Sequence, residues 1–457
     1  MRQHVKVENR LFQGEFNEEK TLQQRTQSQG CFGRYGNTNR RQDFLSESKT
    51  LSHSFHMNSS DKKIFAAIFF SIFTSVTGVG IVVPLLPVYA HDLGASGLYI
   101  SLVFGAFSLS RTFLLPYFGR TSDKKGRKPF IVAGLLGYTL ASVAFMFSTD
   151  VNSLIVVRFL QGIASAMIMP VAQAYIGDIT PEGKEGFYMG LFNLSMFLGL
   201  SIGPLAGGVI NDKFSLNSAF ASMGILAAAG CFLSFFLLPP VSSERIVRRD
   251  KAPVSIDRLL RDRVIAGLFI VRFSYVTCIG IIWCFLPIYA DLEFGFSSSL
   301  IGVLVMLGVC VSGMLQVPMG LLADRLNKRY MIISGSLIIV YAIYSFSWAE
   351  GFRDIIIADI LFGVGGGLST PPVMALSVIK GNENKSMGSI MGLLTVGHSL
   401  GMIFGSFFAG IIMDYCSLRS AFPLGAMIMM AGILFFIFLT REKGFARSRV
   451  DLTEPKS

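Results

Sequence analysis

Five ionisable side chains interrupt long apolar stretches of this sequence, where a charge costs enough free energy to indicate a function. A carboxylate in such a place could take up and release a proton, and a histidine can titrate in the physiological range. A neutral histidine bonded to a neighbouring helix is an equally good interpretation, and the arginines could bind an anionic group or only water. The five are Arg111, Arg158, Arg272, Asp359 and His398.

Several passages recur about two hundred residues further along the chain with their spacing kept. Residues 119–128 read GRTSDKKGRK and residues 320–329 read GLLADRLNKR, an offset of 201. The string RFLQG from Arg158 is answered by DILFG from Asp359 at the same offset. A unit of about 200 residues is far longer than a solenoid or propeller repeat, so the pattern indicates two related halves. In a membrane, such halves are typical of transporters.

The composition is that of a membrane protein. The chain is 52% hydrophobic and 15% charged, whereas soluble domains carry about 25% charged residues. Apolar runs of roughly 20 residues, enough to cross the hydrocarbon layer as a helix, occur twelve times. We therefore predict an all-α integral membrane protein with 12 transmembrane helices in two pseudo-symmetric six-helix bundles. The expected spans are 64–88, 97–118, 129–148, 153–176, 187–210, 217–238, 264–288, 298–322, 330–348, 354–378, 386–413 and 421–440.

The net charge of +11 follows from basic residues that gather in alternate connections between the spans. By the positive-inside rule, this pattern predicts that both termini and the central connection lie in the cytoplasm. The charge therefore indicates orientation in a cell membrane and not a nucleic-acid partner. The basic connections hold Arg120, Lys124, Lys125, Arg127 and Lys128, then Arg245, Arg248, Arg249, Lys251, Arg258, Arg261 and Arg263, then Arg325, Lys328 and Arg329; the others hold only Lys213, Arg353 and Arg419.

The polar segments delimit the expected domains. Residues 1–60 lack an apolar core for a signal peptide and are predicted to be a disordered cytoplasmic tail. A six-helix half over 61–238, a cytoplasmic linker over 239–263, a second half over 264–440 and a tail over 441–457 follow. Met57 precedes a plausible beginning for such a protein, so we expect residues 1–56 to be dispensable for transport.

Neither an enzyme nor a cofactor is expected. The six cysteines are scattered, without metal or disulfide spacing. We find no phosphate-binding loop and no nucleophile with a base, which argues against ATP-driven transport.

Residues 119–128 resemble the signature loop of the major facilitator superfamily, in which glycines permit a tight reversal. The resemblance covers roughly residues 61–440. Thr121 stands where the family has Leu, and Asn327 stands where the second copy would have glycine. The matching residues are Gly119, Ser122, Asp123, Lys124, Gly126, Arg127 and Lys128, then Gly320, Leu322, Ala323, Asp324, Arg325, Lys328 and Arg329.

The resemblance implies a conformational latch between the halves that stabilises the outward-open state. Asp123 would lie near the cytoplasmic N-terminus of span 11, where the helix dipole favours a carboxylate. Arg127 would pair with Asp178, which ends span 4 in the string YIGDITP. Gly119, with Asp324 and Arg325 of the second copy, would complete this machinery. The alternative is that these are flanking charges that only fix topology.

Span 5 carries glycines at i, i+4 and i+8, a smooth face that another helix can approach closely. The longer string resembles the antiporter motif of proton-coupled drug exporters, and GVGIVVPLLP in span 1 resembles a motif of the twelve-span drug:proton antiporters. A packing face common to tight bundles is the alternative. The string consists of Gly190, Gly199, Gly203, Pro204, Gly207 and Gly208.

Arg158 and Gln161 match a span 4 motif that is associated with proton transfer in this family. Spans 1, 4, 7 and 10 line the central cavity of the family fold, so Arg158 and Asp359 could approach each other across it. We hypothesise that Asp359 is a protonation site governed by burial and by Arg158. A static ion pair, or two side chains that reach toward the membrane surface, is the alternative.

The expected substrate is a small hydrophobic solute, carried out of the cell in exchange for protons by a monomer in the lipid bilayer. Spans 1 and 4 have no acidic residue, and three arginines face one aspartate, which favours neutral or anionic substrates. Trp283, with Phe and Met side chains, supplies apolar surface. The alternative is proton-coupled uptake of an organic anion or other small metabolite. A membrane sensor or scaffold that moves nothing is a third class.

Overall fold

The computed structural model describes residues 59–180, 185–239, 256–383 and 387–441, and all its regular elements there are helical. Twelve spans are long and apolar enough to cross a membrane, the first formed by α3 and α4 together. The predicted tails, most of the linker and the basic residues 245–251 lie outside the described residues. The described helices belong to one compact unit, Met57–Ser457.

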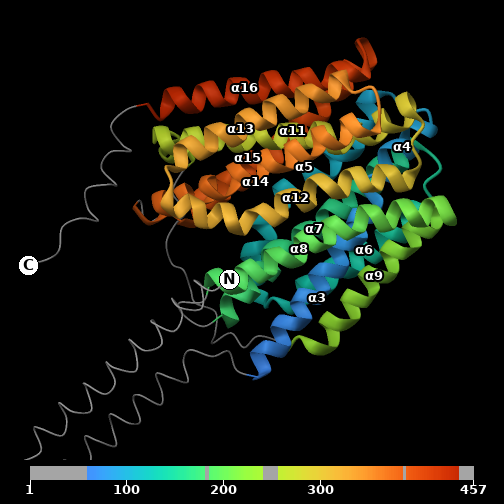
Figure 1. Cartoon of the computed structure of the whole chain (residues 1–457). Helices are drawn as coiled ribbons and strands as arrows, with labels where there is room; N and C mark the ends of the chain where they lie inside the picture. The colour runs from blue at the N-terminus through green and yellow to red at the C-terminus, as the bar shows by residue number, and fades with distance from the viewer. Residues whose placement is uncertain (1–58, 181–184, 240–255, 384–386, 442–457) are drawn as a thin grey trace, which may run out of the picture. The chain divides into compact units, whose positions relative to one another are not determined.

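The long helices alternate in direction (Figure 1). In the first half they are α3 (Ser59–Val82), α4 (Leu85–Asp92), α5 (Gly97–Lys125), α6 (Lys128–Met146), α7 (Val151–Ile179), α8 (Glu185–Lys213) and α9 (Leu216–Leu237). In the second half they are α11 (Arg263–Phe294), α12 (Ser298–Arg325), α13 (Lys328–Ser345), α14 (Phe352–Glu383), α15 (Met387–Tyr415) and α16 (Ala421–Leu439). The short elements are α10 (Ile256–Leu260), η2 (Phe346–Trp348) and η3 (Leu418–Ser420).

The signature loop is shorter than predicted because the helices extend into it. Helix α5 continues to Lys125, and α6 begins at Lys128. Gly126 makes the reversal with a φ of 90°, in the left-handed region that favours glycine. In the second copy Asn327 replaces this glycine and caps α13, because its Oδ1 accepts a hydrogen bond from the Arg329 amide at 3.0 Å. The two copies therefore reverse the chain by different means.

The two halves meet along two helix pairs, α5 with α15 and α8 with α12 (Figure 1). We call the end that carries residues 119–128 and 320–329 the basic end, and the other the opposite end. At the opposite end, glycines bring the halves into backbone contact. Gly410 lies against Gly97, and Gly208 lies against Ser298.

The same four helices also carry glycines nearer the basic end, but there the glycines contact nothing. A Cβ added to any of them would find no atom within 4 Å outside its own helix. These glycines are Gly119, Gly190, Gly320 and Gly392. The backbone contacts between the halves that glycines make therefore lie at the opposite end, whereas Gly313 of α12 meets the Phe197 side chain of α8 about midway along the helices.

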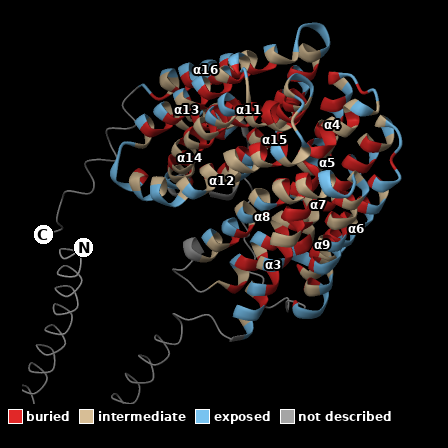
Figure 2. Cartoon of the chain, turned by 45° about the vertical axis from the view of Figure 1, so that its right-hand side comes forward, coloured by how far each residue is buried: buried red, intermediate tan, exposed pale blue. Residues whose placement is uncertain are grey.

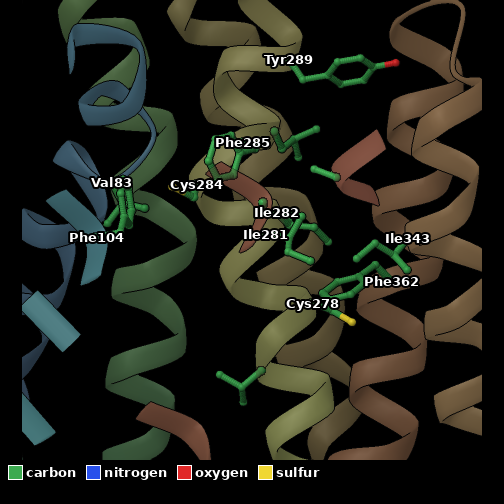
Figure 3. Packing of buried hydrophobic residues seen from close by; sticks show 14 of the residues in the cluster. Val83, Phe104, Cys278, Ile281, Ile282, Cys284, Phe285, Tyr289, Ile343 and Phe362 are labelled. Atoms are coloured by element: carbon green, nitrogen blue, oxygen red, sulfur yellow. The ribbon is translucent and has the colours of Figure 1, made fainter. Parts of the chain in front are cut away.

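Buried residues follow the inner faces of the bundles, and exposed residues lie on the outer faces (Figure 2). Large apolar side chains such as Phe113 and Phe438 are among the exposed ones. Exposed apolar surface of this kind suits a lipid environment. The apolar part of α11 is more deeply buried than that of any of the other eleven spans. Figure 3 shows Cys278, Ile281 and Phe285 along it, packed near Ile343 and Phe362 of neighbouring helices.

Candidate functional site

Three of the predicted residues come together between the halves. Arg272 on α11 and His398 on α15 are hydrogen-bonded, with 3.2 Å between Nη2 and Nδ1. Arg111 on α5, from the other half, lies close enough for its charge to act on the same imidazole. The Nε atoms of both arginines are buried and have no hydrogen-bond partner. The arrangement is a group of donors with no carboxylate among its described charged neighbours.

Arg158 is satisfied within the first half. Its Nη1 donates to Gln161 Oε1 at 2.9 Å, and its Nε donates to the Val103 carbonyl oxygen at 3.4 Å. The guanidinium also lies over the rings of Phe104 and Phe107, 5.0 Å and 4.8 Å from their centroids. Cation–π contacts of this kind stabilise a desolvated arginine. Arg158 and Gln161 therefore form a closed structural unit on α7 and α5.

Asp359 is enclosed between α14 and α12 of the second half. Only 3% of its surface is exposed, and its Oδ2 has no hydrogen-bond partner. Gly308 lies directly against the carboxyl group and leaves no room for a Cβ beside it, since that atom would lie 2.7 Å from Oδ1. A buried carboxyl group with an unpaired oxygen is much less costly when it is protonated.

The predicted approach of Arg158 to Asp359 is not observed. Each residue packs against the neighbouring helix of its own half, Arg158 against α5 and Asp359 against α12. The physical reason is that symmetry-equivalent positions on α7 and α14 repeat the same packing within each half. Arg158 and Asp359 are therefore equivalent in the repeat, but their side chains do not face each other in this conformation.

Trp283 is partly buried and packs against the main core cluster. It therefore contributes apolar surface on α11.

The signature-loop charges form a network at the basic end. Arg127 Nε donates to Asp178 Oδ2 at 3.1 Å, which is the contact that the resemblance implied. Arg127 also donates to the Ser122 hydroxyl at 2.9 Å and forms an ion pair with Asp123. These four residues all belong to the first half, so these bonds do not join the halves. Residues 384–386, just before α15, lie outside the described residues.

The second copy does not repeat this network in the part that the structure describes. Asp324 and Arg325 are exposed at the end of α12. Their role in a latch stays a prediction.

The glycine string of α8 forms the expected close contact. Gly199 and Gly203 lie against Val76, Thr77 and Gly80 of α3. Gly207 continues this face, and a Cβ there would overlap the backbone of Ile81. Helix α8 runs unbroken through Pro204. These three glycines therefore allow α8 to pack directly against α3.

Replacing Gly203 by Ala is expected to lower the free energy of unfolding by about 1–3 kcal/mol, the usual cost of overpacking. The added Cβ would lie 2.6 Å from the Thr77 carbonyl oxygen, which is backbone and cannot easily move. Gly190→Ala is the matched control, because it changes the same helix where no atom lies within 4 Å. Thermal unfolding in detergent measures both. Equal stability of the two variants would contradict this prediction.

Two aspartates that the sequence analysis did not select join the halves at the opposite end. Asp212, at the end of α8, accepts hydrogen bonds from the amides of Ser298 and Ser299 at 3.0 Å and 2.7 Å. In the same way, Asp414 at the end of α15 accepts from the amides of Gly97 and Leu98, at 2.6 Å and 2.9 Å.

Each carboxylate therefore caps the first turn of a helix in the other half. Asp212 and Asp414 are 202 residues apart, and the same offset relates Gly199 to Gly401 and Gly203 to Gly405 on these two helices. A signal for this pair was therefore present in the repeat.

The twelve spans in two related six-helix halves, with ionisable groups at their interface, define a secondary transporter of the membrane rather than an enzyme. The Major Facilitator Superfamily matches residues 68–380 and 268–455 of this chain. The chain belongs to this superfamily and is a multi-pass membrane transporter of small molecules.

Two relatives match most of the chain. An uncharacterized MFS-type transporter of Methanocaldococcus jannaschii is 30% identical over 394 residues, which are 84% of this chain and all of that protein. Multidrug resistance protein 2 of Bacillus subtilis is 27% identical over 384 residues, 81% of this chain and 94% of that protein.

Solved structures share the fold at lower identity. The human organic anion transporter TETRAN is 17% identical with a TM-score of 0.61, and the match covers 83% of this chain and 100% of that one. The nucleoside transporter NupG is 12% identical with a TM-score of 0.70, and it covers 83% of this chain and 100% of that one. At these identities the likeness concerns the fold alone.

Proposed function

We propose that this protein exports small hydrophobic solutes from the cytoplasm across the cell membrane, driven by inward proton flow. The observation that carries the proposal is Asp359, a buried carboxyl group with one oxygen unpaired in a transmembrane helix. Ionisable groups at such depth are rare and mark proton or substrate pathways. The name of the Bacillus subtilis relative, a multidrug resistance protein, supports export.

The proposed cycle alternates the accessibility of the interface between the halves. By the positive-inside rule the basic end faces the cytoplasm. The halves touch at the opposite end, through Asp212 and Asp414. In the proposed cycle this conformation would be closed to the outside and would accept solute from the cytoplasm. Rocking of the halves would then break these contacts and release the solute outside.

Asp359 would couple this motion to protons. Protonated, it can stay buried against Gly308 at little cost; ionised, it requires water or a donor. A conformation open to the outside would load the proton, and one open to the cytoplasm would release it. Substrate and proton need not share one pocket, because coupling requires only that both bias the same equilibrium.

Expression of the full chain in an exporter-deficient bacterial strain tests this function. We expect increased tolerance to some members of a panel of toxic hydrophobic compounds, together with acidification of the cytoplasm when such a compound is added. Cells with an empty vector provide the baseline. Alkalinisation on substrate addition would instead indicate proton-coupled uptake. A complete lack of flux for every compound would favour the sensor or scaffold interpretation.

A further inference from the structure

We propose that Arg111, Arg272 and His398 form a binding site for the oxyanion of a small amphipathic organic anion, and that such anions are the exported solutes. The proposal rests on the proposed export function for its second part. The first part, anion binding, stands on the hydrogen bond between Arg272 and His398 and on the buried, unpaired Nε atoms of the two arginines.

The hydrogen bond between Arg272 and His398 fixes what the site offers. A guanidinium can only donate, so His398 Nδ1 must accept, and the ring is neutral with its proton on Nε2. The imidazole Nε2 and both unpaired arginine Nε atoms are therefore donors. Such a set lacks an acceptor. Carboxylate, phosphonate and sulfonate groups supply acceptors and the missing negative charge.

The neighbours of the two arginines do not compensate their charges. Tyr138 is near enough to Arg111, and Tyr275 to Arg272, for their charges to interact, but both are phenols that are neutral at physiological pH. Two guanidinium charges at membrane depth are costly without a counter-ion. Arg158 provides the internal comparison, since the fold gives that arginine two acceptors and two aromatic rings. Arg111 and Arg272 thus keep a buried Nε without a partner, whereas the Nε of Arg158 donates to a carbonyl oxygen.

The group also departs from the repeat of the two halves. At offsets of 201, 200 and 202 residues, the positions that correspond to Arg111, Arg272 and His398 hold Ser312, Ile72 and Met196, none of which is ionisable. The cluster is therefore an addition to the shared rocking machinery, as a substrate-specific site would be.

The position suits a transported ligand. Arg111 belongs to the first half, whereas Arg272 and His398 belong to the second, so a bound anion would contact both halves. All three residues are partly exposed even though the Nε atoms are buried, which leaves the site reachable. Phe273 follows Arg272 on α11, and its ring packs edge to face on that of Phe404 on α15, with 5.5 Å between the centroids. An anion with an apolar body matches this combination.

Calorimetric titration of the purified full chain with three ligands of one shape tests the site. The probes are 1-naphthoate, its uncharged amide and the cationic 1-naphthylmethylamine. We expect 1-naphthoate to bind at least about tenfold more tightly than either analogue. Equal affinity for the acid and the amide would overturn the proposal.

Variants assign the binding to the cluster. Arg111→Gln and Arg272→Gln are each expected to weaken 1-naphthoate binding about tenfold or more, and Arg272→Lys to weaken it less. Arg419→Gln is the control, since it removes an arginine that is exposed and paired with Glu293. His398→Gln provides a further test should an arginine variant fail to fold. Unchanged affinity in the folded variants would overturn the assignment.

The source of the anion is tested in nanodiscs. The affinity for 1-naphthoate is measured in nanodiscs of phosphatidylcholine and again in nanodiscs of phosphatidylglycerol. Similar affinities in the two lipids would support a soluble anion as the ligand. Displacement by phosphatidylglycerol would show that the site takes a lipid headgroup and would overturn the solute assignment.

Flux measurements separate this inference from the proposed function. Export of uncharged compounds without 1-naphthoate binding would support the proposed export function and overturn the anion site. Binding of 1-naphthoate without any proton-coupled flux would support the anion site and overturn the export function.

Discussion

Replacing Asp359 by Asn is expected to abolish proton-coupled transport while leaving the protein folded. The amide is close in shape to a protonated carboxyl group, so packing against Gly308 on α12 is kept. Asn cannot release a proton, so the group that would link the conformations to the proton gradient is lost. Accumulation of an exported compound in inside-out vesicles under an imposed pH gradient should fall to the level of empty vesicles. Exchange of the compound down its own gradient should continue.

The matched control is Asp354→Asn on the same helix. Asp354 is exposed and only accepts a hydrogen bond from the Glu350 amide, at 2.9 Å, near the start of α14. This variant should keep proton-coupled accumulation near the level of the unmodified chain. If Asp359→Asn also retained coupled accumulation with the same dependence on pH, another group would have to carry the proton.

Features that depend on local sequence were predictable. The twelve spans follow from the length of the apolar runs, and the structure confirms all of them. The shared face of Gly199 and Gly203 follows from helical spacing, because i and i+4 lie on one face, and the structure shows that this face packs on α3. The family pattern also placed Arg127 near Asp178. Each of these inferences depends on the sequence of a single helix, or on a family pattern that already pairs two helices.

Features that depend on the rotation of one helix against another were not predictable. Arg158 and Asp359 are equivalent in sequence, yet each packs within its own half. The position of a residue along its span indicates its height in the membrane. It does not indicate the direction in which the side chain points, because that depends on the rotation of the helix about its axis. The same limit hid the meeting of Arg111 with Arg272 and His398, which belong to three different helices.

Asp212 and Asp414 were missed for another reason. They lie at the ends of spans, where flanking charges are usually solvated, and a search for charges within spans passes over them. Their partners are backbone amides, which no side-chain pattern records. The repeat offset between the two aspartates was the available signal. It becomes informative only when one also considers that the first turns of α5 and α12 have free backbone amides.

Removing both carboxylates, in Asp212→Ala/Asp414→Ala, is expected to shift the protein toward the conformation open at the opposite end. Each aspartate accepts two amide hydrogen bonds from the other half, and a helix cap of this kind contributes about 1 kcal/mol. Loss of both would change the equilibrium between the two conformations by roughly 30-fold. Each single variant should give about the square root of that factor, since the two caps lie on separate helix pairs.

A cysteine in place of Ser101 reports the opening. Ser101 is buried, and its hydroxyl donates to the Ser406 carbonyl oxygen of the other half at 2.6 Å, so the site is shielded while the halves touch. With the exposed Cys416 changed to Ser, alkylation by an impermeant maleimide should accelerate in proportion to the open population.

Asp150→Ala is the matched control for the alkylation experiment. Asp150 caps α7 at the same end of the molecule, with 2.7 Å between its Oδ1 and the Ser153 amide, but it acts within one half. Its removal should cost a similar local stability without changing the alkylation rate. Equal acceleration by Asp150→Ala would mean that fraying of helix ends, and not separation of the halves, exposes position 101. Acceleration in the Asp212 and Asp414 variants, but not in Asp150→Ala, would identify the two caps as the contacts that hold this end closed.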